Sequence, residues 1–352
     1  MNVLIVRLSS VGDVAMTVPV IDSLARTYPD VSFLMLSQPH LKPLFAYLPQ
    51  NVTFYPVYIR EKHNGIIGLY KLFREIKKTR SIDYVADLHD VLRTKLLRLL
   101  FALSGTKSAS INKGRVEKTK LIRKNEKVFH PLKSTFIRYQ DVFASLGFSF
   151  ELQFVSLFGH NKGNLSQIKG ISLKNEREKW IGIAPFAKHK GKIYPLQKTK
   201  EILAFFSKQK DVRIFLFGNG EKENNIFSEL KNTYPNTVSI IGTLNEMSEE
   251  LVLMSHLDVM FSMDSANMHL ASLVETPVVS VWGATHPYAG FYGWKQSPED
   301  AIQIDLPCRP CSIYGNKPCY RKDYACFAEL PAELAIKAIE KHLLSGELRM
   351  ES

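Results

Sequence analysis

A short polar loop near the N-terminus, SSVGD at residues 9–13, carries a carboxylate that could do chemistry. Asp13 follows a glycine at the start of a helical pattern, where aspartate is a preferred N-cap residue. In that position the carboxylate could also act as a general base, accepting a proton from a hydroxyl group that attacks an electrophilic carbon. The local sequence leaves a capping role and a catalytic role open.

A second polar loop, at residues 185–195, concentrates positive charge. It holds three lysines and one histidine, namely Lys188, His189, Lys190 and Lys192. Cations at the end of a strand can neutralise a diphosphate, although exposed loop lysines commonly serve only solubility. Both interpretations fit the residues of this loop.

Two further loops place polar residues beside small ones at a helix start. The FGNGE segment at 217–221 lacks the third glycine of a dinucleotide fingerprint, which disfavours NAD binding. Glu221 of this segment could instead accept hydrogen bonds from ribose hydroxyls. In SMDSANMHLA at 262–271, unpaired backbone N–H groups at the helix start suit a phosphate. His269 could contact a ligand or pack in the core, and we expect Asp264 to hold its loop through backbone hydrogen bonds.

The chain is basic, and much of the excess charge lies in one window. The formal net charge is +12 at pH 7, and residues 107–138 hold ten basic side chains against two acidic ones. Such a segment attracts nucleic acid, anionic lipid or phosphorylated glycolipid, or it is simply a solvated face. Aromatic residues are sparse in the window and no helix-turn-helix, zinc-finger or RNP-like pattern accompanies it, so we expect no nucleic-acid partner.

All cysteines of the chain fall in one short window, at Cys308, Cys311, Cys319 and Cys326. A Cys-x2-Cys pair followed by two more cysteines is compatible with a structural zinc site. The second half lacks the paired spacing of strong zinc motifs, so free thiols are an equally good interpretation. Disulfides are less favoured in a reducing cytosol.

The polar loops have to be positioned by a regular scaffold. At 352 residues the chain is long enough for two domains of about 150 residues each. Short apolar runs rich in Val and Ile alternate with helical segments in both halves, which is typical of parallel sheets covered by helices. We therefore expect an α/β protein with two doubly wound domains facing a central cleft, with ligands beyond the carboxyl ends of the strands.

Composition suggests the domain boundaries. A stretch rich in Lys, Asn and Ser is expected to be a linker (161–178) between a first domain (1–160) and a second domain (179–330). An amphipathic helix is expected to close the chain (331–352). No basic residue precedes the N-terminal apolar run, and no uninterrupted apolar stretch of about 18 residues occurs, so we expect a cytoplasmic protein without a membrane-spanning helix.

Four motifs together resemble glycosyltransferase family 9, the family of the ADP-heptose:lipopolysaccharide heptosyltransferases. They are VLIVRxSSxGD at the N-terminus, KxYP at 192–195, FGxGE at 217–221 and DSxxxHLA at 264–271. The resemblance spans both expected domains, with matching order and spacing. It implies a GT-B fold with an acceptor-binding N-terminal domain, a nucleotide-sugar-binding C-terminal domain, and inverting transfer that needs no metal ion.

The resemblance also implies roles for individual residues. Asp13 would be the catalytic base, Lys192 would contact the donor phosphates, and Glu221 would contact the ribose. The loop around the diphosphate would consist of Asp264, Ser265, Ala266 and His269. The acceptor would be met by Ser10, Gly12, Arg60, Lys62 and Arg93.

The substrates that the resemblance implies are an ADP-sugar, with ADP-heptose as the best match, and a lipid-linked anionic glycan of the lipopolysaccharide core. The protein would then lie peripherally at the inner face of the cytoplasmic membrane.

Two other functions remain open. A nucleotide-sugar epimerase of the same architecture would need no lipid acceptor, and the basic window argues mildly against it. A silent module could bind an anionic glycolipid without turnover, but the retention of Asp13 and Lys192 argues for activity.

Overall fold

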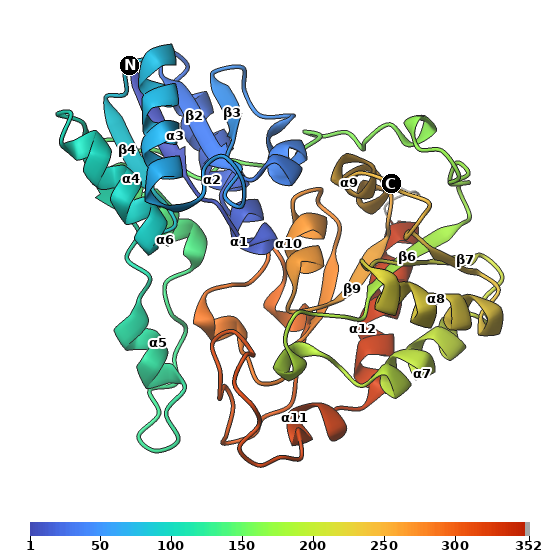
Figure 1. Ribbon diagram of the computed structural model, residues 1–352. Helices are drawn as coiled ribbons and strands as arrows, with labels where there is room; N and C mark the ends of the chain where they lie inside the picture. The colour runs from blue at the N-terminus through green and yellow to red at the C-terminus, as the bar shows by residue number, and fades with distance from the viewer. Residues whose placement is uncertain (349–352) are drawn as a thin grey trace. The chain divides into compact units, whose positions relative to one another are not determined.

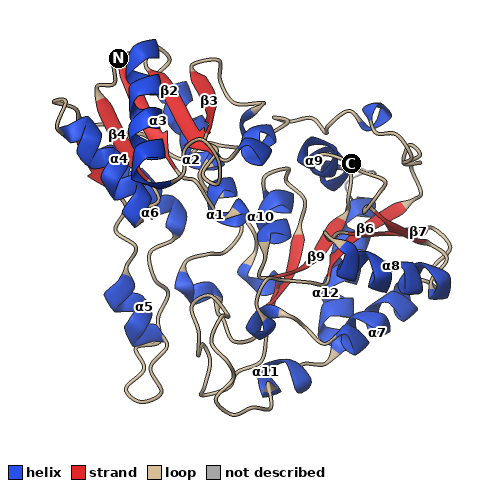
Figure 2. Cartoon of the chain, in the orientation of Figure 1, coloured by secondary structure: helices blue, strands red, loops and turns tan. Residues whose placement is uncertain are grey.

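The computed structural model describes residues 1–348 and divides into two compact units. Unit 1 consists of Met1–Gly114 and Lys133–Leu157, and unit 2 consists of Arg115–Leu132 and the chain from Phe158 onward. Each unit contains one parallel sheet with helices packed on it, as Figure 2 shows. The expected α/β class with two doubly wound sheets is confirmed.

The sheet of unit 1 is five-stranded, in the order β3-β2-β1-β4-β5. Its strands are β1 (Asn2–Val6), β2 (Ser32–Ser37), β3 (Val52–Pro56), β4 (Tyr84–Asp87) and β5 (Lys107–Ser110). The central strands are apolar and buried because helices cover both of their faces. The register places Val6 beside Leu36 on one side and beside Asp87 on the other, which aligns the ends of β1 and β4.

Helices cover both faces of this sheet. They are α1 (Val11–Ala15), α2 (Val18–Thr27), the 3-10 helix η1 (Pro39–Phe45), α3 (Gly65–Thr79), α4 (Leu92–Ala102) and α6 (Thr135–Ala144). The connection from β1 through α2 to β2 moves along the sheet toward β3, whereas the connections from β3 through α3 to β4 and from β4 through α4 to β5 move in the opposite direction. Because such crossovers are right-handed, α2 lies on one face of the sheet and α3 and α4 lie on the other. Leu72 of α3 and Leu97 of α4 accordingly share one apolar cluster with Leu4 of β1.

The sheet of unit 2 is six-stranded, in the order β11-β10-β9-β6-β7-β8. Its strands are β6 (Lys179–Ala184), β7 (Val212–Leu216), β8 (Thr237–Ser239), β9 (Val259–Met263), β10 (Val278–Val281) and β11 (Ala301–Ile302). The α-helices of this unit are α5 (Arg115–Leu121), α7 (Leu196–Phe206), α8 (Glu221–Thr233), α9 (Met247–Ser255), α10 (Ala266–Ser272), α11 (Ala325–Ala328) and α12 (Ala332–Leu348). Phe206, Phe227 and Ile339 bring α7, α8 and α12 into one core with the strands.

One hairpin that interrupts unit 1 in the sequence belongs structurally to unit 2. Residues 115–132 contain α5 and the loop beyond it (Figure 1), and Leu132 N donates a hydrogen bond to Tyr288 O at 2.9 Å. Leu121 is buried in a small apolar cluster of the same unit. The expected first domain, 1–160, is therefore interrupted, because these contacts hold the hairpin to the second unit.

The remaining segments are simple. The expected linker at 161–178 contains a single short 3-10 helix, η2 (Leu165–Gln167). The expected closing helix is observed as α12, which packs against α7, and residues 349–352 lie outside the described part of the chain. None of the helices that the structure describes is both long and apolar enough to cross a bilayer.

Candidate functional site

Each sheet has one point at which the strand order reverses. In unit 1, β2 and β3 lie on one side of β1 and β4 and β5 lie on the other, so β1 and β4 form the switch pair. In unit 2, β7 and β8 lie on one side of β6 and β9 lies on the other, so the pair is β6 and β9. Ligands of open parallel sheets bind beyond the carboxyl ends of the strands at such a point. The loops that carry Asp13, Lys192 and Asp264 leave three of these four strands at that end.

Asp13 lies just beyond β1 and is held by its own loop. Its Oδ2 atom lies 2.7 Å from Arg7 Nη2 and accepts a hydrogen bond from Ser10 Oγ at 2.8 Å. The backbone N–H of Ser10 donates to the same oxygen at 3.3 Å. The side chain of Asp13 is 30% exposed and that of Arg7 only 9%, so the carboxylate is the accessible half of the pair.

The capping hypothesis for Asp13 needs correction. Ser10 is the N-cap residue of α1, and Asp13 is the third residue of the helix. Because Asp13 accepts hydrogen bonds from Ser10, it supports the helix start without being the cap. Gly12 is buried in the same helix. The structure thus gives Asp13 a structural role and, in addition, the exposure that a general base requires.

His89, which sequence analysis did not single out, lies against the loop that follows β1. Its Nδ1 accepts a hydrogen bond from the Leu8 N–H at 3.3 Å, so the proton of the neutral ring is on Nε2. Burial first, and then the positive charges of Arg7 and Lys113, lower the pKa of His89 to about 3. The ring is therefore neutral at physiological pH and offers one N–H. Its place just beyond β4, at the switch point, is the signal that could have identified it.

Arg93 is the second residue of α4 and is partly exposed. It makes no hydrogen bond or ion pair with the residues that the structure describes, and its charge contributes to the low pKa of His89. Lys113 Nζ donates a hydrogen bond to Asp90 O at 3.1 Å in the loop beside it. The switch point of unit 1 therefore presents cations, a neutral histidine and one accessible carboxylate, which suits an anionic substrate with a reacting hydroxyl.

The loop before α3 has structural partners of its own. Lys62 Nζ lies 3.5 Å from Glu75 Oε2, which also accepts hydrogen bonds from Tyr55 at 2.9 Å and from His63 at 3.1 Å. Arg60 is exposed. Within the described chain, neither Arg60 nor Lys62 reaches the loop after β1 through a hydrogen bond or ion pair. Their part in acceptor binding stays a prediction.

In unit 2, Lys192 and Asp264 meet across the switch point. Lys192 Nζ lies 2.9 Å from Asp264 Oδ2, and the two side chains are 17% and 4% exposed. Lys192 ends the 3-10 helix η3 (Lys190–Lys192) after β6, and Asp264 directly follows β9. The expectation that Asp264 holds its loop through backbone hydrogen bonds is wrong, because its carboxylate pairs with the lysine. The pair fixes a cation at the place where a ligand of this sheet would bind.

Two glycines allow the Lys192 side chain to reach Asp264. Gly315 has a φ of +70°, and a Cβ there would lie 2.6 Å from Lys192 Cγ. A Cβ on Gly191 would lie 2.8 Å from Gly315 O. The segment around Gly315 thus covers the aliphatic stem of Lys192 closely, which leaves the lysine little freedom besides the ion pair.

The start of α10 lies beside this ion pair. Ser265 is the N-cap residue, with its hydroxyl 3.3 Å from Ser262 Oγ, and Ala266 is the first helical residue. His269 is buried in the next turn. The first N–H groups of a helix have no partner within it. The loop from Asp264 to Ala266 therefore joins backbone donors to the ammonium group of Lys192.

Glu221 opens α8 and is exposed, as a ribose contact requires. The next carboxylate, Glu223, was not predicted and holds the loop: its Oε2 accepts a hydrogen bond from Asn219 N at 2.7 Å. Burial raises the pKa of Glu223. Gly218 makes room for it, since a Cβ there would lie 2.5 Å from Glu223 Oε2. Glu223 thus stabilises the turn, whereas Glu221 faces solvent.

The cysteines lie around one small cavity without forming the zinc site that their spacing allowed. Cys308, Cys311, Cys319 and Cys326 all line this cavity, and all are free thiols. Burial raises the pKa of Cys326 to about 11. In the described residues no group of three or more His, Cys, Asp or Glu side chains is arranged to hold a metal ion. The four thiols share a cavity, but in the described part of the chain no three of them are arranged as metal ligands.

The basic window at residues 107–138 is partly used inside the protein. Lys118 is buried with its ammonium group 4.2 Å from the centre of the Phe291 ring. Lys127 Nζ donates hydrogen bonds to the carbonyls of Pro307, Arg309 and Pro310 at 3.1, 2.7 and 3.2 Å. These two cations stabilise unit 2, so they do not contribute to an exposed basic face.

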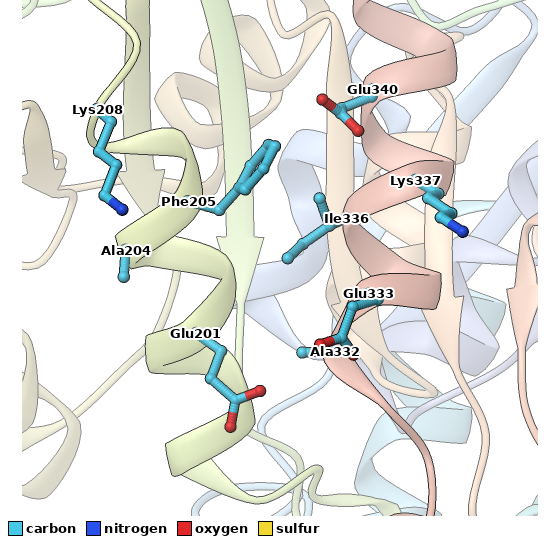
Figure 3. Close-up of a pocket in the computed structure, with 9 residues that line it drawn as sticks. All are labelled: Glu201, Ala204, Phe205, Lys208, Ala332, Glu333, Ile336, Lys337 and Glu340. Carbon is cyan, nitrogen blue, oxygen red and sulfur yellow. The ribbon is translucent and has the colours of Figure 1, made fainter.

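A groove of about 490 Å³ lies elsewhere in unit 2, between α7 and α12. Figure 3 shows Phe205 and Ile336 facing the space between the two helices, with Glu201, Glu333 and Lys337 around it. None of the predicted site residues lines this groove. The loops around Lys192 are the better candidate for a ligand, because they lie at the switch point and carry a fixed cation.

Comparison with known proteins places the chain in a family. The model of glycosyltransferase family 9 (heptosyltransferase) matches residues 69–318, which is more than half of the chain. A search of curated proteins with this chain finds no match.

Solved structures extend the likeness over both units. The E. coli ADP-heptose LPS heptosyltransferase II has a TM-score of 0.72 at 17% identity, covering 99% of this chain and 100% of that one. A family 9 glycosyl transferase from Veillonella parvula DSM 2008 has a TM-score of 0.72 at 17% identity, with 98% and 97% covered. The E. coli heptosyltransferase WaaC, solved with ADP, has a TM-score of 0.66 at 18% identity, with 97% and 100% covered. The chain belongs to glycosyltransferase family 9, the heptosyltransferase family, and is a glycosyltransferase.

Proposed function

We propose that the protein transfers heptose from ADP-heptose to a lipid-linked anionic acceptor of the lipopolysaccharide core, at the inner face of the cytoplasmic membrane. The observation that carries the proposal is the Lys192–Asp264 ion pair at the switch point of unit 2. It holds a cation beside a helix start, where a diphosphate is well bound. The choice of donor is supported by WaaC, which was solved with ADP and with ADP-2-deoxy-2-fluoro heptose.

On the donor side, Lys192 is the main cationic contact. A diphosphate would share the ammonium group with Asp264, which keeps the lysine oriented. Glu221 would accept hydrogen bonds from the ribose hydroxyls, and Ser265 and Ala266 would offer backbone N–H groups. Lys192 and these donors would stabilise the negative charge of the leaving diphosphate, and the proposal includes transfer without a metal ion.

On the acceptor side, Asp13 is the proposed general base. The acceptor oxygen attacks the anomeric carbon on the face opposite to ADP, so the configuration inverts. As the new C–O bond forms, the hydroxyl proton passes to the Asp13 carboxylate, the bond to the phosphate oxygen breaks, and ADP leaves with its electron pair. Arg7, at 2.7 Å, holds the carboxylate in place.

The other polar groups of unit 1 are assigned to binding. Arg93 and Lys113 supply positive charge for an acidic acceptor, and the neutral ring of His89 offers a hydrogen bond from Nε2. Charge-assisted hydrogen bonds of this kind are roughly twice as strong as neutral ones. Ser10 lies beside the base and could contact the reacting sugar.

The test is a transfer assay with defined substrates. The protein is incubated with ADP-heptose and heptose-deficient lipopolysaccharide, and the acceptor is analysed by mass spectrometry. The proposal predicts the gain of one heptosyl residue together with stoichiometric ADP release. Interconversion of a free nucleotide sugar without acceptor would favour an epimerase, and acceptor binding without turnover would favour a silent module. A thermal-shift panel of ADP-, UDP-, GDP- and CMP-sugars identifies the donor, because a ligand that binds the folded state raises its apparent stability.

A further inference from the structure

One face of unit 1 exposes apolar side chains to an unusual degree. Ile66, Ile67, Leu92 and Leu103 are between 74% and 86% exposed, and they are the four most exposed large apolar side chains among the described residues. Tyr70 and Leu99 lie near them, at 50% and 54%. Five of the six lie in α3 or α4, and the sixth, Leu103, is the C-cap residue of α4. Scattered exposed apolar residues are normal, but a concentration on two neighbouring helices indicates an interaction surface.

The two helices that carry these residues are neighbours. Both lie on the same face of the sheet, they pack against each other, and Figure 1 shows them side by side. In α4 the outward positions 92, 95, 99 and 103 recur every three or four residues, which is one stripe of a helix. The inward positions, such as Leu97 and Phe101, are buried in the core. The exposed stripe of α4 therefore lies outside the core.

The same two helices are strongly basic. They contain seven basic residues and a single acidic one, the basic ones being Lys71, Arg74, Lys77, Lys78, Arg93, Lys95 and Arg98. The acidic residue, Glu75, is occupied by hydrogen bonds from Tyr55 and His63. Cations interleaved with aliphatic side chains are the pattern of surfaces that rest on anionic membranes.

We propose that the α3–α4 face docks on the surface of an anionic lipid bilayer. Charge complementarity decides the occupant: a second copy of this face would repel the first, because each carries the same positive charge. Nucleic acid is disfavoured because Tyr70 is the one exposed aromatic side chain of the two helices available to stack on bases. Lys95 and Arg98 lie 3.6 and 3.8 Å from Asp90 Oδ1, so the anionic headgroups would chiefly meet exposed cations of α3 such as Lys71 and Lys78. The aliphatic side chains would enter the boundary between headgroups and acyl chains.

The position of the face relative to the acceptor site adds to this argument. In a parallel sheet, each crossover helix begins at the carboxyl edge of the strand before it. The first turns of α3 and α4, with Ile66, Ile67 and Leu92, therefore begin at the edge of the sheet where Asp13 and His89 lie. The inference rests on the proposed function in this respect, since a docked face would bring that edge to a lipid-linked acceptor.

The test is co-sedimentation of the full chain with vesicles, which requires no substrate. The protein is expected to bind vesicles of phosphatidylglycerol and phosphatidylcholine and not vesicles of phosphatidylcholine alone. The variant I67Q/L99Q/L103Q should bind at least tenfold more weakly at an unchanged melting temperature, and so should K71E/K78E. The control L173Q/L334Q changes exposed leucines of unit 2 and should bind like the wild type.

Two results would overturn the inference. One is equal binding of the wild type and I67Q/L99Q/L103Q to the anionic vesicles. The other is a wild-type dimer in light scattering that becomes monomeric in this variant, which would make the face a protein interface. Activity on a detergent-dispersed acceptor separates this inference from the proposed function, because the variant should lose vesicle binding and keep that activity.

Discussion

At the scale of single residues, the Lys192–Asp264 pair explains how the chain could hold a diphosphate. Replacing Lys192 with Ala should weaken ADP binding by about tenfold or more, because a charge-assisted contact of about 1.5–3 kcal/mol is lost. Isothermal titration calorimetry measures this effect. The control is Lys190→Ala, since Lys190 is in the same loop but lies over the Tyr324 ring instead of pairing with Asp264.

Removal of Lys192 alone would leave the Asp264 carboxylate buried without its cation. Lys192→Ala should therefore melt several degrees lower, and Lys192→Ala with Asp264→Asn should regain part of that loss. If donor affinity returned in the double variant as well, Lys192 would be a structural residue and not a phosphate contact.

His89 gives unit 1 a pH dependence whose sign follows from its pKa. The folded-state pKa of about 3 lies below the ordinary value of 6.5, so the unfolded chain takes up the proton first as the pH falls. Stability contributed by this residue is present above pH 6.5 and is lost between pH 6.5 and about 3. His89→Gln should therefore reduce the fall in melting temperature that accompanies a fall in pH below 6.5. The control His40→Gln, at an exposed position, should leave the pH dependence of the melting temperature unchanged. Identical curves for wild type and His89→Gln would contradict the burial of the ring.

At the scale of elements, the strands and their loops follow closely from the sequence. The Val- and Ile-rich runs with polar loops predicted both parallel sheets, and the strand-end rule placed Asp13, Lys192 and Asp264 in loops beyond the carboxyl ends of strands. The observed strand order then shows that these strands belong to the switch pairs. The pairing of Lys192 with Asp264 could not be predicted, because residues 72 positions apart meet only through the order β6 beside β9. Likewise His89 is recognisable only once β4 is known to lie beside β1.

The grouping of the hairpin at residues 115–132 with unit 2 is hidden from the sequence for a similar reason. Its high charge suggests a solvated loop, but Lys127 is held by three backbone carbonyls and Leu121 is buried. Local sequence cannot show that carbonyls from residues 307–310 will be the partners of this lysine. The same holds for the cysteines, whose spacing permits a zinc site that the fold does not form.

The contacts of Lys127 make the hairpin testable as an element. Lys127→Met removes the hydrogen bonds to three carbonyls, so the hairpin should detach more often, and chymotrypsin should cleave within residues 115–132 several-fold faster. Lys120→Met, an exposed lysine of α5, is the matched control. Equal cleavage rates in the two variants would show that apolar packing alone holds the hairpin.

At the scale of the whole molecule, the account divides the two substrates between the two units. Exposed cations of unit 1 would meet the anionic acceptor, whereas the cation of unit 2 is a shielded ion pair. Raising the ionic strength should therefore increase the acceptor KM more than the donor KM, since screening acts most strongly on exposed charges. Steady-state kinetics from low to high salt provides the comparison, and equal responses of both constants would contradict this division.

The measurement that tests the central claim most directly is the turnover of Asp13→Asn with ADP-heptose and acceptor. Asparagine keeps the size of the side chain and a carbonyl oxygen for Ser10, but it cannot take the proton. The account predicts a fall in kcat of about 10²–10⁴-fold with donor affinity unchanged. Asp22→Asn, which breaks an Asp–Arg pair of 2.8 Å in α2, controls for the lost ion pair and should keep its kcat. Normal turnover by folded Asp13→Asn would contradict the account and leave Asp13 as a helix-supporting residue only.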